Sequence, residues 1–155
     1  MTGGTTLRDT VELSFDPARL DLDLIHRFLS TDAYWSAGIP RAVVERAVAN
    51  SLCIGAYADG AQVGFARLIT DRATFAYLAD VFVVSARRGR GIATRMVRAL
   101  LAHDDVWGLR RVLLFTADAH ALYEGLGFAS LARPERAMEI VRPNIYRIAA
   151  SSAAL

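Results

Sequence analysis

The sequence has no lysine and a single cysteine, Cys53, among its 155 residues. One cysteine cannot form a disulfide within the chain. It lies in the apolar stretch SLCIGAY, where we expect a small buried side chain of a strand rather than a catalytic nucleophile. Cysteine and histidine are nowhere clustered at the spacing of a zinc site, so we expect no metal.

Long apolar runs and a strong net charge are missing as well. No run approaches the ~20 apolar residues that a membrane span needs, and the N-terminal MTGGTTLRDT has no signal-peptide core. A net charge of +2 gives little attraction for nucleic acid. We therefore expect one cytoplasmic domain over residues 1–155, with its core over about 7–147 and no membrane or nucleic-acid partner.

Apolar periodicity and turn signals predict the order β-α-α-β-β-β-α-β-α-β-β. Asp59-Gly60 is a strong hairpin signal, and Asp71-Arg72 marks a second turn. The order implies an α/β fold with a mixed central sheet of six to seven strands and helices on both faces. Helices are expected over 18–29, 40–49, 91–103 and 119–126, and strands over 7–15, 52–58, 62–70, 74–84, 111–116, 128–131 and 137–141.

Three arginines and two glycines meet where the fourth expected strand gives way to a helix, in SARRGRGIAT over residues 85–94. The first amides of a helix have no acceptor inside it, and the helix dipole adds partial positive charge there. Glycines let the backbone approach a ligand, so this junction could cradle a phosphate group. A purely structural turn, with its arginines on a solvated helix face, is the alternative.

Two motifs carry a resemblance to a known family. Residues 88–93, RGRGIA, fit the pattern R/Q-x-x-G-x-G/A, and residues 122–128, LYEGLGF, resemble the element L-Y-E-x-L-G-F. The two motifs, in this order and with the strand DVFVV before the first, resemble those of the GNAT superfamily of N-acetyltransferases. The expected order of strands and helices also resembles that of the family, over nearly the whole chain. The resemblance implies that two parallel strands splay apart and admit acetyl-CoA as the co-substrate.

The resemblance also assigns the residues that would bind acetyl-CoA. The pantetheine arm would bond to backbone groups of the central strand, and the pyrophosphate would meet the amides at the start of the following helix. The implied residues are Val81, Val83, Arg88, Gly89, Arg90, Gly91, Ile92, Ala93 and Thr94.

Acetyl transfer to an amine requires two proton transfers, and Tyr123 and Asp80 are the candidate residues for them. The departing thiolate needs a proton, and Tyr123 holds the position where the family places its general acid. An alkylammonium must lose a proton before it attacks. Asp80 could accept that proton or contact the substrate, and a structural salt bridge to an arginine is the alternative.

The acceptor is less defined. Tyr34 and Trp35 occupy a short loop and could form one wall of an acceptor pocket or a hydrophobic plug. We expect direct acetyl transfer to the primary amine of a small molecule within a ternary complex. The alternatives are a non-catalytic acyl-CoA sensor and an acyltransferase that acts on a peptide or protein amine. A homodimer is possible.

Overall fold

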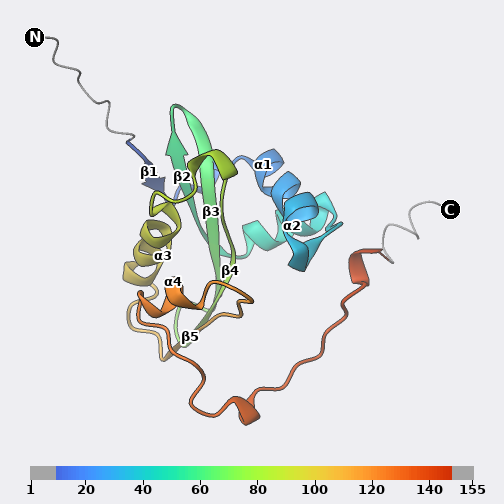
Figure 1. Cartoon of the computed structure of the whole chain (residues 1–155), viewed down its shortest axis with the longest axis vertical. Coiled ribbons are helices and arrows are strands. Elements are labelled where there is room, and N and C mark those ends of the chain that lie inside the picture. Colours follow the sequence, from blue (N-terminus) through green and yellow to red (C-terminus); the bar gives the residue numbers. More distant parts are fainter. Residues whose placement is uncertain (1–9, 148–155) are drawn as a thin grey trace, which may run out of the picture. The chain divides into compact units, whose positions relative to one another are not determined.

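The computed structural model describes residues 10–147 (Figure 1). They form two compact units, which are described separately: residues up to Asp21 with Asn50–Leu114, and Leu22–Ala49 with the chain from Phe115 onward. None of the described helices combines the length and apolarity needed to cross a membrane.

The first unit is built on one mixed sheet in the order β1-β2-β3-β4-β5. The first three pairings are antiparallel, and β4 pairs with β5 in parallel. The α/β class is confirmed, but the described residues form five strands rather than six or seven. The strands are β1 (Glu12–Ser14), β2 (Leu52–Ala58), β3 (Ala61–Thr70), β4 (Phe75–Val83) and β5 (Arg111–Leu113).

Two tight turns set the register of the central strands, as the sequence predicted. Asp59 and Gly60 both adopt positive φ, 51° and 78°, which matches the twist of the flanking strands β2 and β3. At the next turn, the carboxylate of Asp71 accepts hydrogen bonds from the amides of Ala73, Thr74 and Phe75. A hydrogen bond from the Thr74 hydroxyl, together with these three backbone bonds, holds the pKa of Asp71 well below its usual range.

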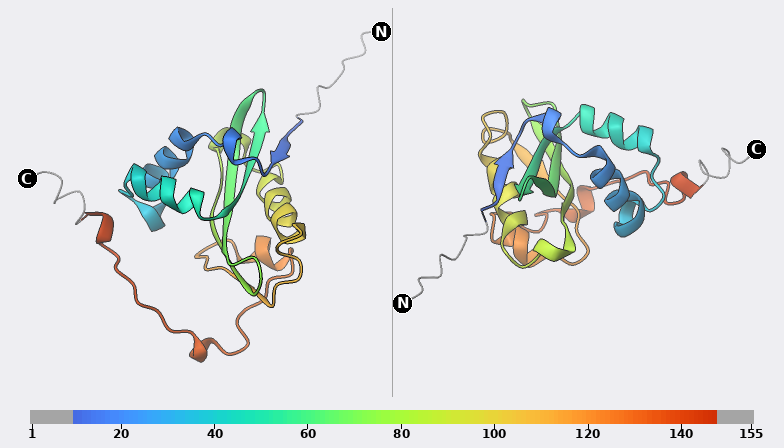
Figure 2. Two further views of the ribbon diagram at one scale, coloured as in Figure 1. Left: turned by 180° about the vertical axis from the view of Figure 1, so that it is seen from behind. Right: turned by 90° about the horizontal axis from the view of Figure 1, so that it is seen from above.

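Helix α3 (Ile92–Ala102) packs on one face of this sheet (Figure 2). Its buried side chains recur at helical spacing, as expected for an amphipathic helix. They are Ile92, Met96, Val97 and Leu100. The close approach requires Gly64 on β3, where an added Cβ would lie 3.0 Å from the terminal methyl of Met96 and 3.2 Å from the carbonyl oxygen of Phe82.

The second unit contains α1 (Leu22–Arg27), α2 (Arg41–Ala49) and α4 (His120–Glu124). The predicted helix over 18–29 is wrong in its first turn: Pro17–Arg19 form a separate 3₁₀ turn capped by Asp16, and Leu20 is extended. After Arg27 the chain widens into a π turn, η2 (Phe28–Asp32), followed by the 3₁₀ turn η3 (Tyr34–Ser36). The buried Ser36 hydroxyl links the two turns, because it donates a hydrogen bond to the carbonyl oxygen of Leu29 at 2.7 Å.

The other predicted elements need smaller corrections. The strand expected over 7–15 is β1, of which residues 7–9 lie outside the described part. The strand expected over 111–116 ends at Leu113, and the helix expected over 119–126 is the shorter α4. Residues 128–131 and 137–141 form no strand, because this segment meets no second strand to complete a ladder and has only the 3₁₀ turn η5 (Pro134–Arg136).

Replacing Gly64 with alanine should destabilise the first unit. The new methyl group would press on a backbone carbonyl that cannot move aside, and such overpacking costs about 1–3 kcal/mol. Gly108→Ala is the matched control, since a Cβ there meets nothing within 4 Å; it should change stability by less than about 0.5 kcal/mol. Urea denaturation of both variants tests this, and equal losses would contradict it.

Candidate functional site

The β4–β5 pair opens along its length. Parallel pairing joins Phe75 to Arg111 and Tyr77 to Leu113, and no pairing follows on this side, although β4 continues to Val83. On its other side β4 stays paired with β3 as far as Val83 and Gly64. The second half of β4 therefore presents an edge away from β3 that an extended ligand could join by backbone hydrogen bonds. Val81 and Val83, both predicted to bind, lie in this half.

The chain then turns through two glycines into α3. After the 3₁₀ turn η4 (Ser85–Arg87), Gly89 and Gly91 adopt φ of 76° and 75°, a region that other residues rarely enter. A Cβ on either would meet nothing within 4 Å, so the space beside them is open.

The first turn of α3 has amides without acceptors in the helix. The first helical bond runs from Arg95 N to Gly91 O at 3.1 Å, which places the amides of Ile92, Ala93 and Thr94 ahead of it. No acidic side chain occupies this turn to neutralise the positive end of the dipole. The junction can therefore hold an anion, and it contains the predicted residues from Arg88 to Thr94.

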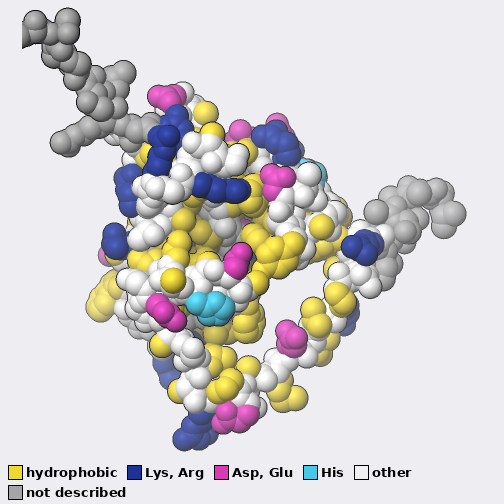
Figure 3. Space-filling model, in the orientation of Figure 1, with side chains coloured by type: hydrophobic (Ala, Val, Ile, Leu, Met, Phe, Trp, Pro, Cys, Tyr) yellow, Lys and Arg dark blue, Asp and Glu magenta, His cyan; other side chains and the backbone are white. Residues whose placement is uncertain are grey.

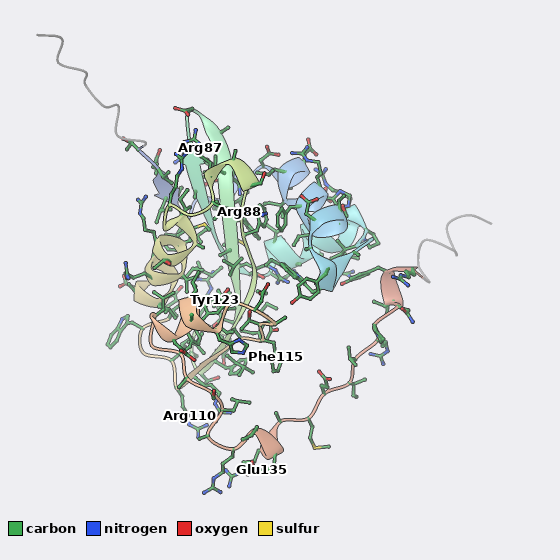
Figure 4. The ribbon with its side chains drawn as sticks, in the orientation of Figure 1. Arg87, Arg88, Arg110, Phe115, Tyr123 and Glu135 are labelled. Atoms are coloured by element: carbon green, nitrogen blue, oxygen red, sulfur yellow. The ribbon has the colours of Figure 1, made fainter. Side chains whose placement is uncertain are left out.

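The arginines around this junction divide into two groups. Arg87 pairs with Asp59 at 2.5 Å, and Arg95 donates to the carbonyl oxygen of Val11 at 2.9 Å, so both also fix the fold. Among residues 10–147, Arg88 donates only through Nε, to the carbonyl oxygen of Val83 at 3.0 Å. Its two terminal nitrogens stay available at the end of the sheet where β4 meets η4 (Figure 4).

Asp80 sits at an irregularity in β4. Its φ is 55°, and the register with β3 shifts between Phe65 and Arg67. The carboxylate accepts a hydrogen bond from Arg67 Nε at 2.6 Å, and Arg67 Nη1 donates to Ser51 Oγ at 3.0 Å. The ion-paired side chains are only 14% and 10% exposed. The structure thus contains the salt bridge that the sequence left as one alternative, and a role toward substrate stays a prediction.

Cys53 pairs with Arg67 across β2 and β3 and is buried. Burial raises the pKa of its thiol to about 12. Since the thiolate is the nucleophilic form, this cysteine is unreactive at neutral pH.

Tyr123 lies on α4 in the second unit. Its ring packs edge-on against Phe128 with 5.8 Å between centroids, and the Phe128 amide donates to the Tyr123 carbonyl oxygen at 3.1 Å. Burial, aided by the negative charge of Asp118, raises the pKa of the phenol. The hydroxyl therefore keeps its proton at neutral pH and can act as a proton donor.

Tyr34 and Trp35 form most of η3. Their rings meet at 89° with 5.1 Å between centroids, and they are 68% and 48% exposed. Neither ring is buried as a hydrophobic plug would be. The pair offers an aromatic surface on which a cation could stack.

Sequence reasoning missed Arg67 and Ser51. Arg67 lies in β3 and Ser51 directly precedes β2, and only the register of β2, β3 and β4 brings Arg67 to Asp80 and Ser51 to Arg67. Thr116 was missed as well: its hydroxyl accepts from the Ala119 amide at 3.0 Å and so fixes the entry to α4.

Removing Arg67 should cost more stability than removing an exposed arginine. Arg67→Met would remove the guanidinium from the largely buried carboxylate of Asp80, and breaking such a pair costs about 3 kcal/mol. Arg72→Met breaks an exposed pair with Asp105 and should cost less than about 1 kcal/mol. Urea unfolding of the two variants compares them directly, and a loss below about 1 kcal/mol for Arg67→Met would show that the pair does not stabilise the bulge.

Comparisons with known proteins agree with these features. The sequence pattern of the Acetyltransferase (GNAT) family matches residues 21–128. A curated protein of Gibberella zeae, provisionally named an acetyltransferase, is 34% identical over 131 residues, which cover 72% of this chain and 74% of that protein. A crystal structure from Xanthomonas campestris, assigned to the same family, is 50% identical with a TM-score of 0.86 and covers 88% of this chain and 96% of that one.

A more distant structure, glucosamine-6-phosphate N-acetyltransferase from Arabidopsis thaliana, shows likeness of fold alone. It is 13% identical with a TM-score of 0.60, over 86% of this chain and 97% of that chain. The family pattern and the two nearer relatives carry the assignment: this chain belongs to the GNAT family of acetyltransferases.

Proposed function

We propose that the protein transfers an acetyl group from acetyl-CoA to the primary amine of a small molecule, by direct attack within a ternary complex. Membership of the family gives the reaction class, an acyl transfer. The open, uncompensated N-terminus of α3 beside the free edge of β4 is the observation that supports the donor. A cytoplasmic location is part of the proposal.

The residues before α3 and those along β4 suit two chemically different parts of acetyl-CoA, the pyrophosphate and the pantetheine arm. The pyrophosphate is an anion, and it would be held by the amides over 89–94 with Arg88 and Arg90 nearby. The pantetheine arm carries amide groups, and it would extend along β4 at Val81 and Val83. When bound, acetyl-CoA supplies the activated thioester.

The chain's own groups would move the protons. The amine nitrogen attacks the thioester carbonyl carbon, and the carbon–sulfur bond breaks. The nitrogen's proton passes to Asp80, directly or through water, or Asp80 only orients the ammonium group. The departing sulfur takes the phenol proton of Tyr123, whose raised pKa keeps that proton in place until it is needed.

Direct transfer is favoured over a covalent acetyl-enzyme. The only cysteine is buried and its pKa is about 12, so it would not attack a thioester at neutral pH. For the acceptor, the exposed rings of Tyr34 and Trp35 suit a cationic amine better than an anion.

Coenzyme binding should depend on Gly91. Coenzyme A, acetyl-CoA and desulfo-CoA should each raise the melting temperature of the wild type, because a ligand of the folded state stabilises it by about 2.7 kcal/mol at 100 times its Kd. Gly91→Ala should lose at least ten-fold in affinity, because alanine is strained at this φ and shifts the amides.

The matched control is Gly60→Ala, which has the same backbone strain, φ 78°, and the same open surroundings in a hairpin turn. It should lower stability similarly and leave coenzyme affinity unchanged. The absence of any thermal shift at millimolar acetyl-CoA would refute the proposed donor site.

Turnover should depend on the hydroxyl of Tyr123. Tyr123→Phe keeps the ring contact with Phe128 but removes the proton donor, so free-thiol release should fall about 10²–10⁴-fold. Affinity for acetyl-CoA should not change. The measurement is thiol release by the wild type over a panel of small amines, followed by the variant with the best acceptor.

Tyr57→Phe serves as the control, because the buried Tyr57 hydroxyl has no hydrogen-bond partner within residues 10–147 and has no proposed role. Equal turnover by Tyr123→Phe and the wild type would remove Tyr123 from the mechanism. Coenzyme binding without turnover on any amine would instead favour an acyl-CoA sensor, and turnover only on peptides would favour a peptide or protein acceptor.

A further inference from the structure

Arg67 differs from the arginines of the proposed donor site in its place and its surroundings. Basic side chains gather at the surface where β4 meets η4 (Figure 3), and the proposed function uses them for the pyrophosphate. Arg67 instead lies within β3, and its side chain is only 14% exposed. Strand alternation puts it on the face away from α3, because Gly64, three residues earlier, faces Met96 of that helix. Arg67 is therefore a feature separate from the anion site before α3.

The guanidinium group of Arg67 is held at two of its nitrogens and open at the third. Nε donates to the carboxylate of Asp80 at 2.6 Å, and Nη1 donates to Ser51 Oγ at 3.0 Å. Within residues 10–147, Nη2 has no hydrogen-bond partner. It stays accessible, because Tyr57 Oη is the one unpaired side-chain polar atom that this part of the chain buries. Nη2 can therefore donate to a further acceptor.

The ion pair lies beside the part of β4 where the reaction is proposed. β5 stops pairing with β4 at Tyr77, so Asp80 lies in the half of β4 that has an open edge. A pantetheine arm that runs from the start of α3 along Val83 and then Val81 would direct its thioester end toward Asp80. The positive φ of Asp80 is strain of the kind that collects at functional sites. An amine positioned by Asp80 would thus have Arg67 next to it.

The pair of Arg67 and Asp80 carries two opposite charges in contact and no net charge. A simple alkylammonium would be attracted by the carboxylate but repelled by the guanidinium beside it. A free amino acid carries its ammonium and its carboxylate on one carbon, so it also presents two adjacent opposite charges. Its ammonium can lie against Asp80 while its carboxylate accepts from Arg67, whose planar fork suits a carboxylate. A carboxylate next to the amine therefore turns the repulsion into an attraction.

We propose that the acceptor is an α-amino acid, with its amine at Asp80 and its carboxylate bound by Arg67. The inference rests on the proposed function and deepens it by naming the acceptor class. It makes Arg67 a specificity-determining residue, because Nε holds Asp80 in place while Nη2 binds the substrate. A buried pair that only stabilised the sheet would need no open donor, since apolar residues of similar volume often serve a core as well.

Matched acceptors test this with the wild type alone. Thiol release from acetyl-CoA is measured with each protein amino acid, and then with the decarboxylated amine and the carboxamide of the best one. The value of kcat/KM should be at least about ten-fold higher for the amino acid, because each analogue lacks the charged hydrogen-bond acceptor. The carboxamide is a strict control, because more of its amine is unprotonated at neutral pH.

The outcomes separate this inference from the proposed function. Equal kcat/KM values for the three compounds, or thiol release with simple amines and with no amino acid, overturn the inference and leave acetyl transfer to amines standing. Release with no acceptor at all counts against both. A missing thermal shift with acetyl-CoA refutes the donor site itself.

Variants of Arg67 test which residue carries the preference. Arg67→Met removes the guanidinium, and Arg67→Lys keeps a charge without the fork that serves Asp80 and a carboxylate together. In both, the ratio of kcat/KM for the amino acid to that for its decarboxylated amine should fall toward one. The ratio compares two substrates in one preparation, so loss of folded protein does not change it. Arg72→Met removes an exposed arginine and should keep the wild-type ratio. An unchanged ratio in the Arg67 variants overturns the assignment.

Discussion

The hydrogen bonding of β4 is the constraint on which the rest of the first unit depends. β4 is paired with β3 along its length, but with β5 only from Phe75 to Tyr77. A parallel neighbour that stops early leaves a strand with one edge open where it reaches α3. Because α3 packs its apolar face on the same sheet, its N-terminus is fixed next to that open edge. One pairing pattern therefore places an open backbone edge beside a helix N-terminus, and these are the two features that the proposed donor site uses.

The irregularity at Asp80 lies on the same strand. A non-glycine residue at φ 55° is strained, and such strain persists only where the surroundings stabilise it. Here Arg67 and Ser51 supply the stabilisation through two hydrogen bonds in a largely buried position. A bulge changes the direction in which a strand presents its amides. The ion pair is thus compatible with a functional Asp80, because it fixes β4 directly before Val81 and Val83, where the pantetheine arm is proposed to bind.

The features that were predicted correctly are those that depend on residues close together in the sequence. The hairpin at Asp59-Gly60, the turn at Asp71 and the apolar face of α3 each depend on neighbouring residues, and all three are confirmed. Gly89 and Gly91 of RGRGIA both adopt positive φ before α3, a conformation that glycine enters at little cost.

Long-range contacts left no local signal. Arg67 meets Asp80 only because a bulge shifts β3 against β4. The 3₁₀ and π turns around α1 were missed because the side chains of 18–29 keep helical spacing while the backbone departs from it. Roles that require a substrate are not determined by the fold: the role of Tyr123 comes from the motif over 122–128, and that of Tyr34 and Trp35 from their place in a short loop.

The disagreement over 137–141 has a different cause. AMEIV is a short, largely apolar run, which by itself predicts a strand. The structure of one chain shows the same residues extended and exposed, without a ladder. A strand exists only where a neighbouring strand completes its ladder, and a local sequence pattern does not specify that neighbour. The pattern over 137–141 therefore predicted an element that the described residues do not form.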